Sequence, residues 1–219
     1  MISNKVYGYK LVYTNEPVVL TGTVSVSSIE GAGNPEISRI DYLRNKYGKL
    51  TSAEINNRIN LRGATHDKLD ELIERELKNG MSKKKIQNKL GPAVAGVYDP
   101  VTDKYYFGIN NLNGDLPENL HRLLRVNYEN MPTEGIYTEY NKFTLGAGSH
   151  AEIYALNEAL IERESMGISV KSLDELILTV IKGPKCGWKK TGMPMPRCPH
   201  CEYITNGASY FPEVLKYAK

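Results

Sequence analysis

The sequence predicts an α/β domain, in which helices cover a β-sheet in layers, for the second half of the chain. Beyond Gly91-Pro92 the patterns follow the order strand, strand, helix, helix, strand, helix and short last strand. The stretch 174–182, DELILTVIK, is an almost continuous apolar run, typical of a strand buried on both faces. Hydrophobic residues make up 41% and charged residues 24%, ordinary values for a globular protein. The 219 residues are enough for a sizeable core.

The start of the chain predicts an α+β region. Residues 1–26 alternate between apolar and polar positions, which indicates a pair of strands. Short helices follow. Thr51 and Glu54 have the spacing of a capping box, and Thr65 and Ser82 are placed to cap the next two helices.

We place a domain boundary at Gly91-Pro92, where the third helix is expected to stop. Residues 1–90 then form an N-terminal region of unknown role, and residues 91–219 the functional domain. The basic residues are unevenly spread, because residues 1–90 hold 15 Lys and Arg against 10 Asp and Glu, with a basic run at 82–89. A net charge of +3 does not by itself predict binding to nucleic acid, since solvated charge runs are common.

The domain after residue 91 is predicted element by element. Two apolar stretches joined by a turn at 100–103 indicate a β-hairpin. A helix with Pro117 in its first turn and leucines on one face comes next, and then a Gly/Ser loop that runs into a second helix. The predicted elements are, in order, strands 93–99 and 104–110, helices 116–130 and 150–165, strand 174–182, a helix from 198 and a last strand within 208–215.

Several classes of protein are disfavoured by the sequence. No apolar run approaches the roughly 18–20 residues of a membrane span. The N-terminus MISNKVYGYKLVY has neither an apolar h-region nor a small-residue cleavage site, so no cleavable signal peptide is expected in this chain. Three widely placed cysteines do not form a disulfide framework.

Cys198 and Cys201 stand in a C-P-H-C frame, which occurs in redox dithiols and in metal sites. A thioredoxin-type dithiol lies early in its domain, and here only 18 residues follow Cys201, so the redox interpretation lacks room. In a metal site both cysteines would point at one ion from the first turn of a helix. Pro199 would fix that turn, and the positive helix end would favour thiolates.

A third ligand is required, and His150 is the best candidate among the four histidines. It opens a helix after a Gly-Ala-Gly-Ser approach, and Glu152 follows two residues later. His200 would point away from the metal shared by its neighbours, while His66 and His121 are expected to be solvated surface residues. H-x-E followed by C-x-x-C is the pattern of zinc deaminases, and three protein ligands leave one position for water.

SHAEIYALNEAL and PMPRCPHCEYIT, preceded by GPAVAGVYDPVTDKYYFGINN, resemble the YwqJ-type deaminases. These are a branch of the cytidine deaminase-like superfamily and occur as toxin domains of bacterial polymorphic toxins. The resemblance covers about residues 90–219 and implies a three-layer α-β-α domain with a mixed sheet. Two departures from the general pattern are Arg197 between Pro196 and Cys198, and a long His-to-Cys interval.

The resemblance implies a zinc-dependent hydrolase that deaminates a cytosine or cytidine, acting on C–N bonds of cyclic amidines. Zn²⁺ held by His150, Cys198 and Cys201 would lower the pKa of a bound water from about 15.7 to about 7, and Glu152 would move the protons. As a secreted toxin acting in the cytoplasm of a target cell, the protein would need a cognate immunity protein. The substrate stays open between DNA, RNA and a free nucleoside, and between cytosine and adenine.

Two further positions are candidates for substrate contacts. Asn110, at the end of the second hairpin strand, matches an asparagine that deaminases often use to hold the sugar or base, although turn chemistry before Gly114 explains it equally well. Trp188 lies in a basic loop and could stack on a base. The lysines and arginine of that loop, which could contact phosphates or simply be solvated, are Lys182, Lys185, Lys189, Lys190 and Arg197.

A second hypothesis is a structural zinc module of an interaction protein. Cys186 would then join His150, Cys198 and Cys201 as a fourth ligand and leave no position for water. The two hypotheses differ in whether Cys186 is needed to hold the metal and in whether Glu152 is needed for anything beyond folding.

Overall fold

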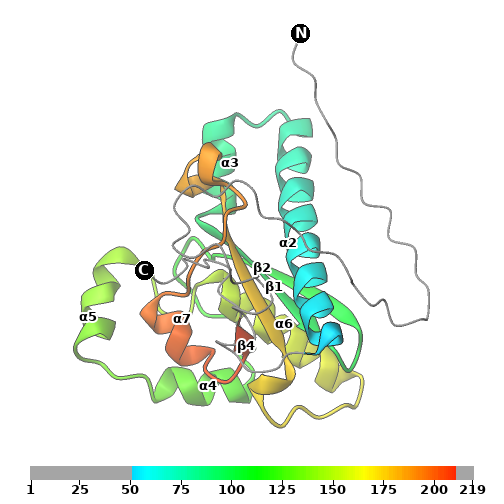
Figure 1. The fold of residues 1–219 in the computed structure, drawn as a ribbon. Coiled ribbons are helices and arrows are strands. Elements are labelled where there is room, and N and C mark those ends of the chain that lie inside the picture. Colours follow the sequence, from blue (N-terminus) through cyan, green and yellow to red (C-terminus); the bar gives the residue numbers. More distant parts are fainter. Residues whose placement is uncertain (1–50, 211–219) are drawn as a thin grey trace, which may run out of the picture.

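The computed structural model describes residues 51–210. The strand pair predicted for residues 1–26 and the end of the predicted last strand lie outside the described residues. Within them, a four-stranded mixed sheet has the order β2-β1-β3-β4 (Figure 1). β1 pairs antiparallel with both β2 and β3, and β3 pairs parallel with β4. The strands are β1 (Ala93–Asp99), β2 (Lys104–Ile109), β3 (Ile177–Lys182) and β4 (Ser209–Tyr210).

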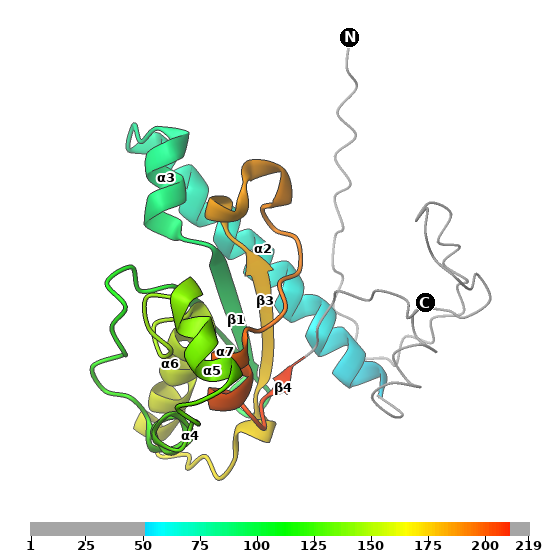
Figure 2. The same ribbon diagram turned by 90° about the vertical axis from the view of Figure 1, so that its left-hand side faces the viewer.

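Helices lie on both faces of this sheet, as Figure 2 shows, with α2 on one side and α6 with the short helices α4, α5 and α7 on the other. The three-layer α/β fold predicted from the sequence is therefore confirmed. The helices are α2 (Ser52–Lys78), α3 (Lys83–Leu90), α4 (Arg122–Glu129), α5 (Ile136–Tyr140), α6 (Ala151–Ser165) and α7 (Pro199–Ile204). In the described part of the chain there are also four 3₁₀ turns, namely η1 (Asn141–Phe143), η2 (Leu173–Glu175), η3 (Pro184–Cys186) and η4 (Trp188–Lys190).

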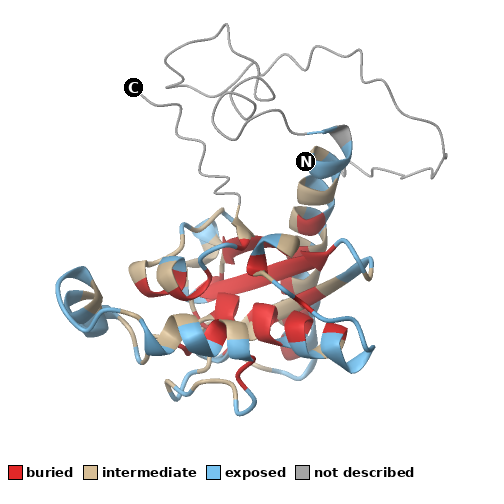
Figure 3. Cartoon of the chain, turned by 90° about the horizontal axis from the view of Figure 1, so that it is seen from below, coloured by how far each residue is buried: buried red, intermediate tan, exposed pale blue. Residues whose placement is uncertain are grey.

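Every residue of β1 is buried, because alternate side chains point into two separate apolar clusters. Ala95 and Val97 belong to the main core, which α6 fills with fully buried side chains such as Leu156. Val94 and Tyr98 face α2 instead. Figure 3 shows this burial through the sheet and along the facing sides of the helices. Burial on both faces is the physical reason why the central strands are apolar at nearly every position.

The predicted helix ends are largely confirmed. Thr51 and Glu54 form a complete capping box at the start of α2, and Ser82 caps α3. Gly80 and Gly91 follow the ends of these helices with φ of 75° and 72°, in the left-handed region that glycine adopts without a steric penalty.

Two of the predicted helix starts are wrong. Thr65 does not begin a helix, since it lies inside α2, where its buried hydroxyl donates to the carbonyl of Leu61 at 2.7 Å. The helix predicted from residue 116 begins only at Arg122. His121 is its N-cap, and its N–H donates to Asn157 Oδ1 at 2.7 Å, which holds the approach extended.

The expectation that His121 is solvated is also wrong. Its ring is buried, Nδ1 accepts from the Leu123 N–H, and Nε2 lies 3.0 Å from the Glu164 carboxylate. The histidine therefore joins the start of α4 to the end of α6, a role that its charged sequence neighbours conceal.

The long helix α2 and the short helix α3 are packed onto the domain. Leu69 lies against Val94 and Ile181 of the sheet, and Ile86 and Leu90 of α3 close an apolar cluster with Leu72. The proposed domain boundary at residues 90 and 91 stays a prediction. In residues 51–210, the helices are all too short or too polar to span a membrane.

Candidate metal and catalytic site

The N-terminus of α6 supplies His150 and Glu152. His150 is the N-cap residue, with extended backbone angles of φ −85° and ψ 154°, yet its side chain makes no capping hydrogen bond. The imidazole is therefore available to face the neighbouring helix. The approach to α6 is fixed to the sheet, because the Asn111 N–H at the end of β2 donates to the Ser149 carbonyl at 2.8 Å.

The N-terminus of α7 supplies the two cysteines. Cys198 is the N-cap, Pro199 occupies the first helical position, and the Cys201 N–H points at Cys198 Sγ at 3.4 Å. The chain reaches this point by turning back along β3, where the Met195 N–H donates to the Val180 carbonyl at 3.0 Å. This return brings the start of α7 next to the start of α6.

His150, Cys198 and Cys201 meet at one point. His150 Nδ1 lies 3.0 Å from Cys201 Sγ and 3.2 Å from Cys198 Sγ, and the three ligand atoms all lie within 4.8 Å of one another. One imidazole nitrogen and two thiolates form a donor set that suits zinc, and three protein ligands are typical of a catalytic rather than a structural site. Cys186 does not join the group, because its thiol donates to the Pro92 carbonyl at 3.3 Å.

The charges in this cluster are strongly coupled. A hydrogen bond from the Cys201 thiol, with help from His150, lowers the pKa of Cys198 to about 4. Burial raises the pKa of Cys201 well above its usual value. Burial alone would lower the pKa of His150, but the hydrogen bond and negative charge of Cys198 raise it overall. The cluster thus already holds one thiolate, the form in which cysteine binds metal.

Glu152 is 4% exposed and lines a cavity of about 320 Å³, together with His150 and Cys198. Burial, followed by the negative charge of Cys198, raises the pKa of Glu152. A raised pKa is typical of carboxyl groups that act as proton carriers in active sites.

Thr144 holds one of the candidate ligands, whereas the neighbouring His200 does not. The Thr144 hydroxyl is hydrogen-bonded to His150 Nε2, so that Nδ1 is left to face the cysteines. A second nitrogen that is held in this way is the usual arrangement in metal-binding histidines. His200 points away from the cluster, as expected. Its Nε2 donates to the Tyr137 carbonyl at 2.7 Å, and its ring packs edge-on against Tyr140.

The segment that carries Thr144 also forms one wall of the cavity. Tyr140 and Phe143 stand side by side, with ring centroids 5.9 Å apart, and both line the cavity. The sequence reasoning missed Tyr140, Phe143 and Thr144. The signal available was the aromatic stretch YTEYNKF just before the Gly/Ser loop, but nothing in one sequence places it next to C-P-H-C.

Of the two predicted substrate contacts, Asn110 lies in the cavity wall and Trp188 does not. The Asn110 Oδ1 atom is buried without a hydrogen-bond partner in the described part of the chain, so it is available to a ligand. Trp188 instead packs beside α3, with Lys83 Nζ 5.6 Å from its ring centre.

The basic residues of the loop that contains Trp188 also differ in whether they line the cavity. Lys185 lines the cavity. Arg197 was expected beside the site, but it donates to the Thr205 carbonyl and hydroxyl and stacks on Tyr210 at 4.3 Å. The extra residue before Cys198 therefore anchors the end of α7 and leaves the ligand positions undisturbed.

Comparisons with known proteins agree with this geometry. The family model described as YwqJ-like deaminase matches residues 77–210. The chain is also 44% identical to Toxin YwqJ of Bacillus subtilis (strain 168) over 216 residues, which are 97% of this chain and 33% of that protein. The chain therefore spans about a third of the length of this relative. No solved structure matches.

Proposed function

Because this chain belongs to the YwqJ-like deaminase family, we propose that it is a zinc-dependent hydrolytic deaminase that acts on cytosine in nucleic acid. In this proposal it is a hydrolase of C–N bonds in cyclic amidines. The observation that carries it is the meeting of His150, Cys198 and Cys201 beside Glu152 in one cavity.

Zinc would be held by His150 Nδ1 and the Sγ atoms of Cys198 and Cys201, which already face one another. Bound zinc would supply an activated water as the nucleophile. The thiolate character of Cys198 favours metal binding, and Thr144 holds the histidine ring in the required orientation.

The protein's own part in the reaction is proton transfer and positioning. Glu152 takes one proton from the attacking water and gives it to the ring nitrogen. It then takes the second proton from the newly added hydroxyl group and gives it to the amine, which leaves as ammonia as the C–N bond breaks and the carbonyl forms. Its burial beside Cys198 supports this role, because both the burial and the negative charge of Cys198 raise the pKa of the carboxyl group and so favour its protonated form. Asn110 is the proposed contact to the sugar or base, supported by its unpaired Oδ1.

We further propose that this deaminase acts as a toxin. The support is the named toxin to which the chain is similar. In this proposal the protein is secreted, acts in the cytoplasm of a target cell and is neutralised in its producer by a cognate immunity protein. The free nucleoside stays as an alternative substrate.

Three measurements test the proposal. The metal content of the purified native protein should be close to one zinc per chain. Deamination should be measured on single-stranded and double-stranded DNA and RNA and on cytidine. DNA and RNA from cells that express the wild type should carry C-to-T or C-to-U changes, and cells that express Glu152→Ala should not. A native protein without zinc would refute the proposal.

A further inference from the structure

Two lysine-rich segments that are about 100 residues apart in the sequence lie side by side in the structure. They are α3 and the loop that contains η3 and η4, drawn next to each other at the top of Figure 1. Gln87 Nε2 of α3 donates to the Pro184 carbonyl at 3.0 Å. Trp188 of η4 packs against the cluster of Ile86 and Leu90. Trp188 thus fastens the loop to the helix.

The lysines that these segments expose form one positively charged area, which we call the basic surface. Its members are Lys83, Lys84, Lys85, Lys185, Lys189 and Lys190, all exposed. Neither 79–92 nor 183–197 contains an acidic residue. Within residues 51–210, no carboxylate lies within ion-pair distance of these six lysines, whereas Lys68, Lys78 and Lys104 each pair with a glutamate. A cluster of like charges without counter-charges favours binding of a polyanion.

The basic surface is continuous with the cavity. Lys185 lines the cavity, and its N–H donates to the Gly91 carbonyl at 3.2 Å. Gly91 lies against Asn110, since a Cβ added at Gly91 would be 3.5 Å from the Asn110 Cβ. Glu152, Asn110 and Lys185 therefore line one and the same cavity, and Lys185 is the member of the basic surface that reaches it.

The neighbouring surface between β2 and α6 has a more acidic lining. There a shallow groove of about 840 Å³ runs along β2 and α6, and it shares Asn110 with the cavity. Its lining includes Glu118, Glu158 and Glu162. Glu162 pairs with Lys104, while Glu118 and Glu158 leave negative charge on this groove. Phosphates are therefore disfavoured along it, and the basic surface is the more favourable path for a polyanion.

We propose that the basic surface binds the phosphodiester backbone of a single-stranded nucleic acid and leads one nucleotide into the cavity past Lys185. This inference rests on the proposed function and narrows its substrate to a polynucleotide. The cavity of about 320 Å³ has the size of a site for one small ligand. The lysines of α3 and η4 extend beyond it, where a free nucleoside has no group to offer them.

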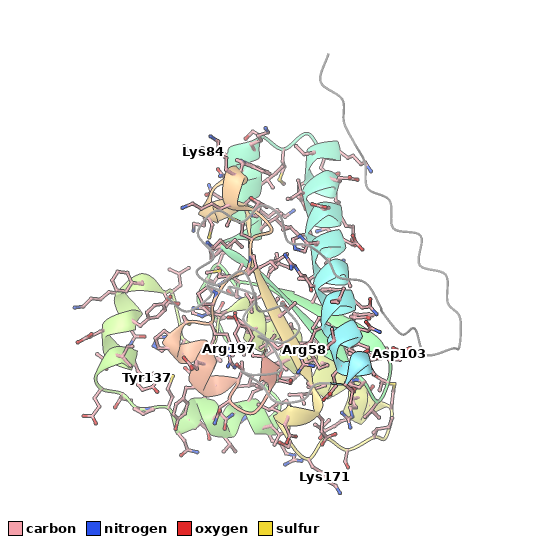
Figure 4. All side chains as sticks on the ribbon, viewed as in Figure 1. Arg58, Lys84, Asp103, Tyr137, Lys171 and Arg197 are labelled. Atoms are coloured by element: carbon pink, nitrogen blue, oxygen red, sulfur yellow. The ribbon has the colours of Figure 1, made fainter. Side chains whose placement is uncertain are left out.

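The test uses the zinc-loaded chain with the Glu152→Gln substitution, so that bound substrate is not consumed. Binding of dye-labelled single-stranded DNA and RNA of about 20 nucleotides is measured from 50 to 300 mM salt, in the parent and in Lys84→Gln/Lys189→Gln. The matched control is Lys104→Gln/Lys171→Gln, which removes the same charge elsewhere. Figure 4 shows Lys84 and Lys171 at opposite ends of the molecule. Zinc content and melting temperature are compared in all of them.

We expect the double substitution on the basic surface to weaken binding of at least one polymer about tenfold at low salt. Each phosphate contact contributes about 0.7 to the salt slope on a single strand, so the slope should fall by about 1.4. The control pair should change the dissociation constant less than twofold. Lys185→Gln should lower the ratio of kcat/KM for the oligonucleotide to that for cytidine, and Lys185→Arg should restore it.

Equal oligonucleotide binding by the parent and the Lys84→Gln/Lys189→Gln variant would overturn the inference. The inference would also be overturned if these lysines were needed only for binding to anionic lipid vesicles or to an acidic protein. The two proposals can fail separately. Deamination of cytidine by the wild type, without lysine-dependent binding of oligonucleotides, would support the proposed deaminase function and refute the role of the basic surface. Lysine-dependent binding of oligonucleotides without any deamination would support the basic surface and refute the proposed function.

Discussion

Gly108 of β2 lies directly against the backbone of α6, which makes Gly108→Ala a sharp test of the structure. A Cβ at residue 108 would lie 2.3 Å from the Ala151 carbonyl oxygen and 2.6 Å from the Ala155 nitrogen. Both are backbone atoms of α6, so no side-chain rotation relieves the contact. Ala151 directly follows His150, and the helix start that carries the proposed ligand must therefore move.

The size of the effect follows from these distances. To bring the 2.3 Å contact to an ordinary 3.4 Å, α6 has to shift by about 1 Å relative to β2. Overpacking of this kind lowers the free energy of unfolding by about 1–3 kcal/mol. Because the contacts are with backbone atoms, which cannot rotate away, we expect Gly108→Ala to lie at the upper end, about 3 kcal/mol. For a chain of this size, that lowers the melting temperature by roughly 6–12 °C. Because ligand distances in metal sites tolerate only about 0.2 Å, zinc affinity should fall as well.

Urea denaturation and zinc analysis measure both effects, and Gly63→Ala is the matched control. Gly63 lies inside α2 with nothing within 4 Å of an added Cβ. Alanine there should raise stability by about 0.5–1 kcal/mol, since glycine costs that much inside a helix. If Gly108→Ala keeps the wild-type midpoint and full zinc content, the packing of α6 on β2 described above is wrong.

Other substitutions test the site and the core. Glu152→Gln should keep the fold and the zinc and lower kcat by about 10²–10⁴; wild-type turnover would remove Glu152 from the chemistry. In metal analysis, Cys186→Ser should keep its zinc and Cys198→Ser should lose it. Loss of zinc from both variants would favour the structural zinc module. Arg163→Leu leaves the buried Asp99 carboxylate without its cation, so unfolding in urea should show a loss of about 3–5 kcal/mol. An unchanged midpoint would contradict that ion pair.

Local signals in the sequence were enough for most of the fold. The hairpin, the buried strand and the capping box at Thr51 depend on neighbouring residues, and all three are confirmed. The candidate set of His150, Cys198 and Cys201 came from the H-x-E and C-x-x-C patterns at two predicted helix starts, and the structure brings these atoms together. Their role as zinc ligands stays a prediction.

What the sequence did not predict depends on contacts between distant segments. Thr144 and Tyr140 reach the site because His200, a residue that faces away from the metal, holds α5 against α7. Thr65 resembles a helix cap but lies against Gly96 of β1, where a Cβ would be 2.0 Å from its hydroxyl. No local pattern contains such a partner. The basic surface of α3, η3 and η4 could not be predicted for the same reason, because its lysines come from segments far apart in the sequence.

The short helix α7 has a consequence for folding. It is six residues long, far below the length at which a helix is stable in isolation. Two of the three candidate ligands lie at its start, and the third lies 48 residues earlier in the chain. A metal bound there would act as a cross-link across that interval and would stabilise the native state by about 2.7 kcal/mol at a hundredfold excess over its dissociation constant. We therefore expect chelators to release α7 from α6 first, while the hairpin and α2 keep their packing.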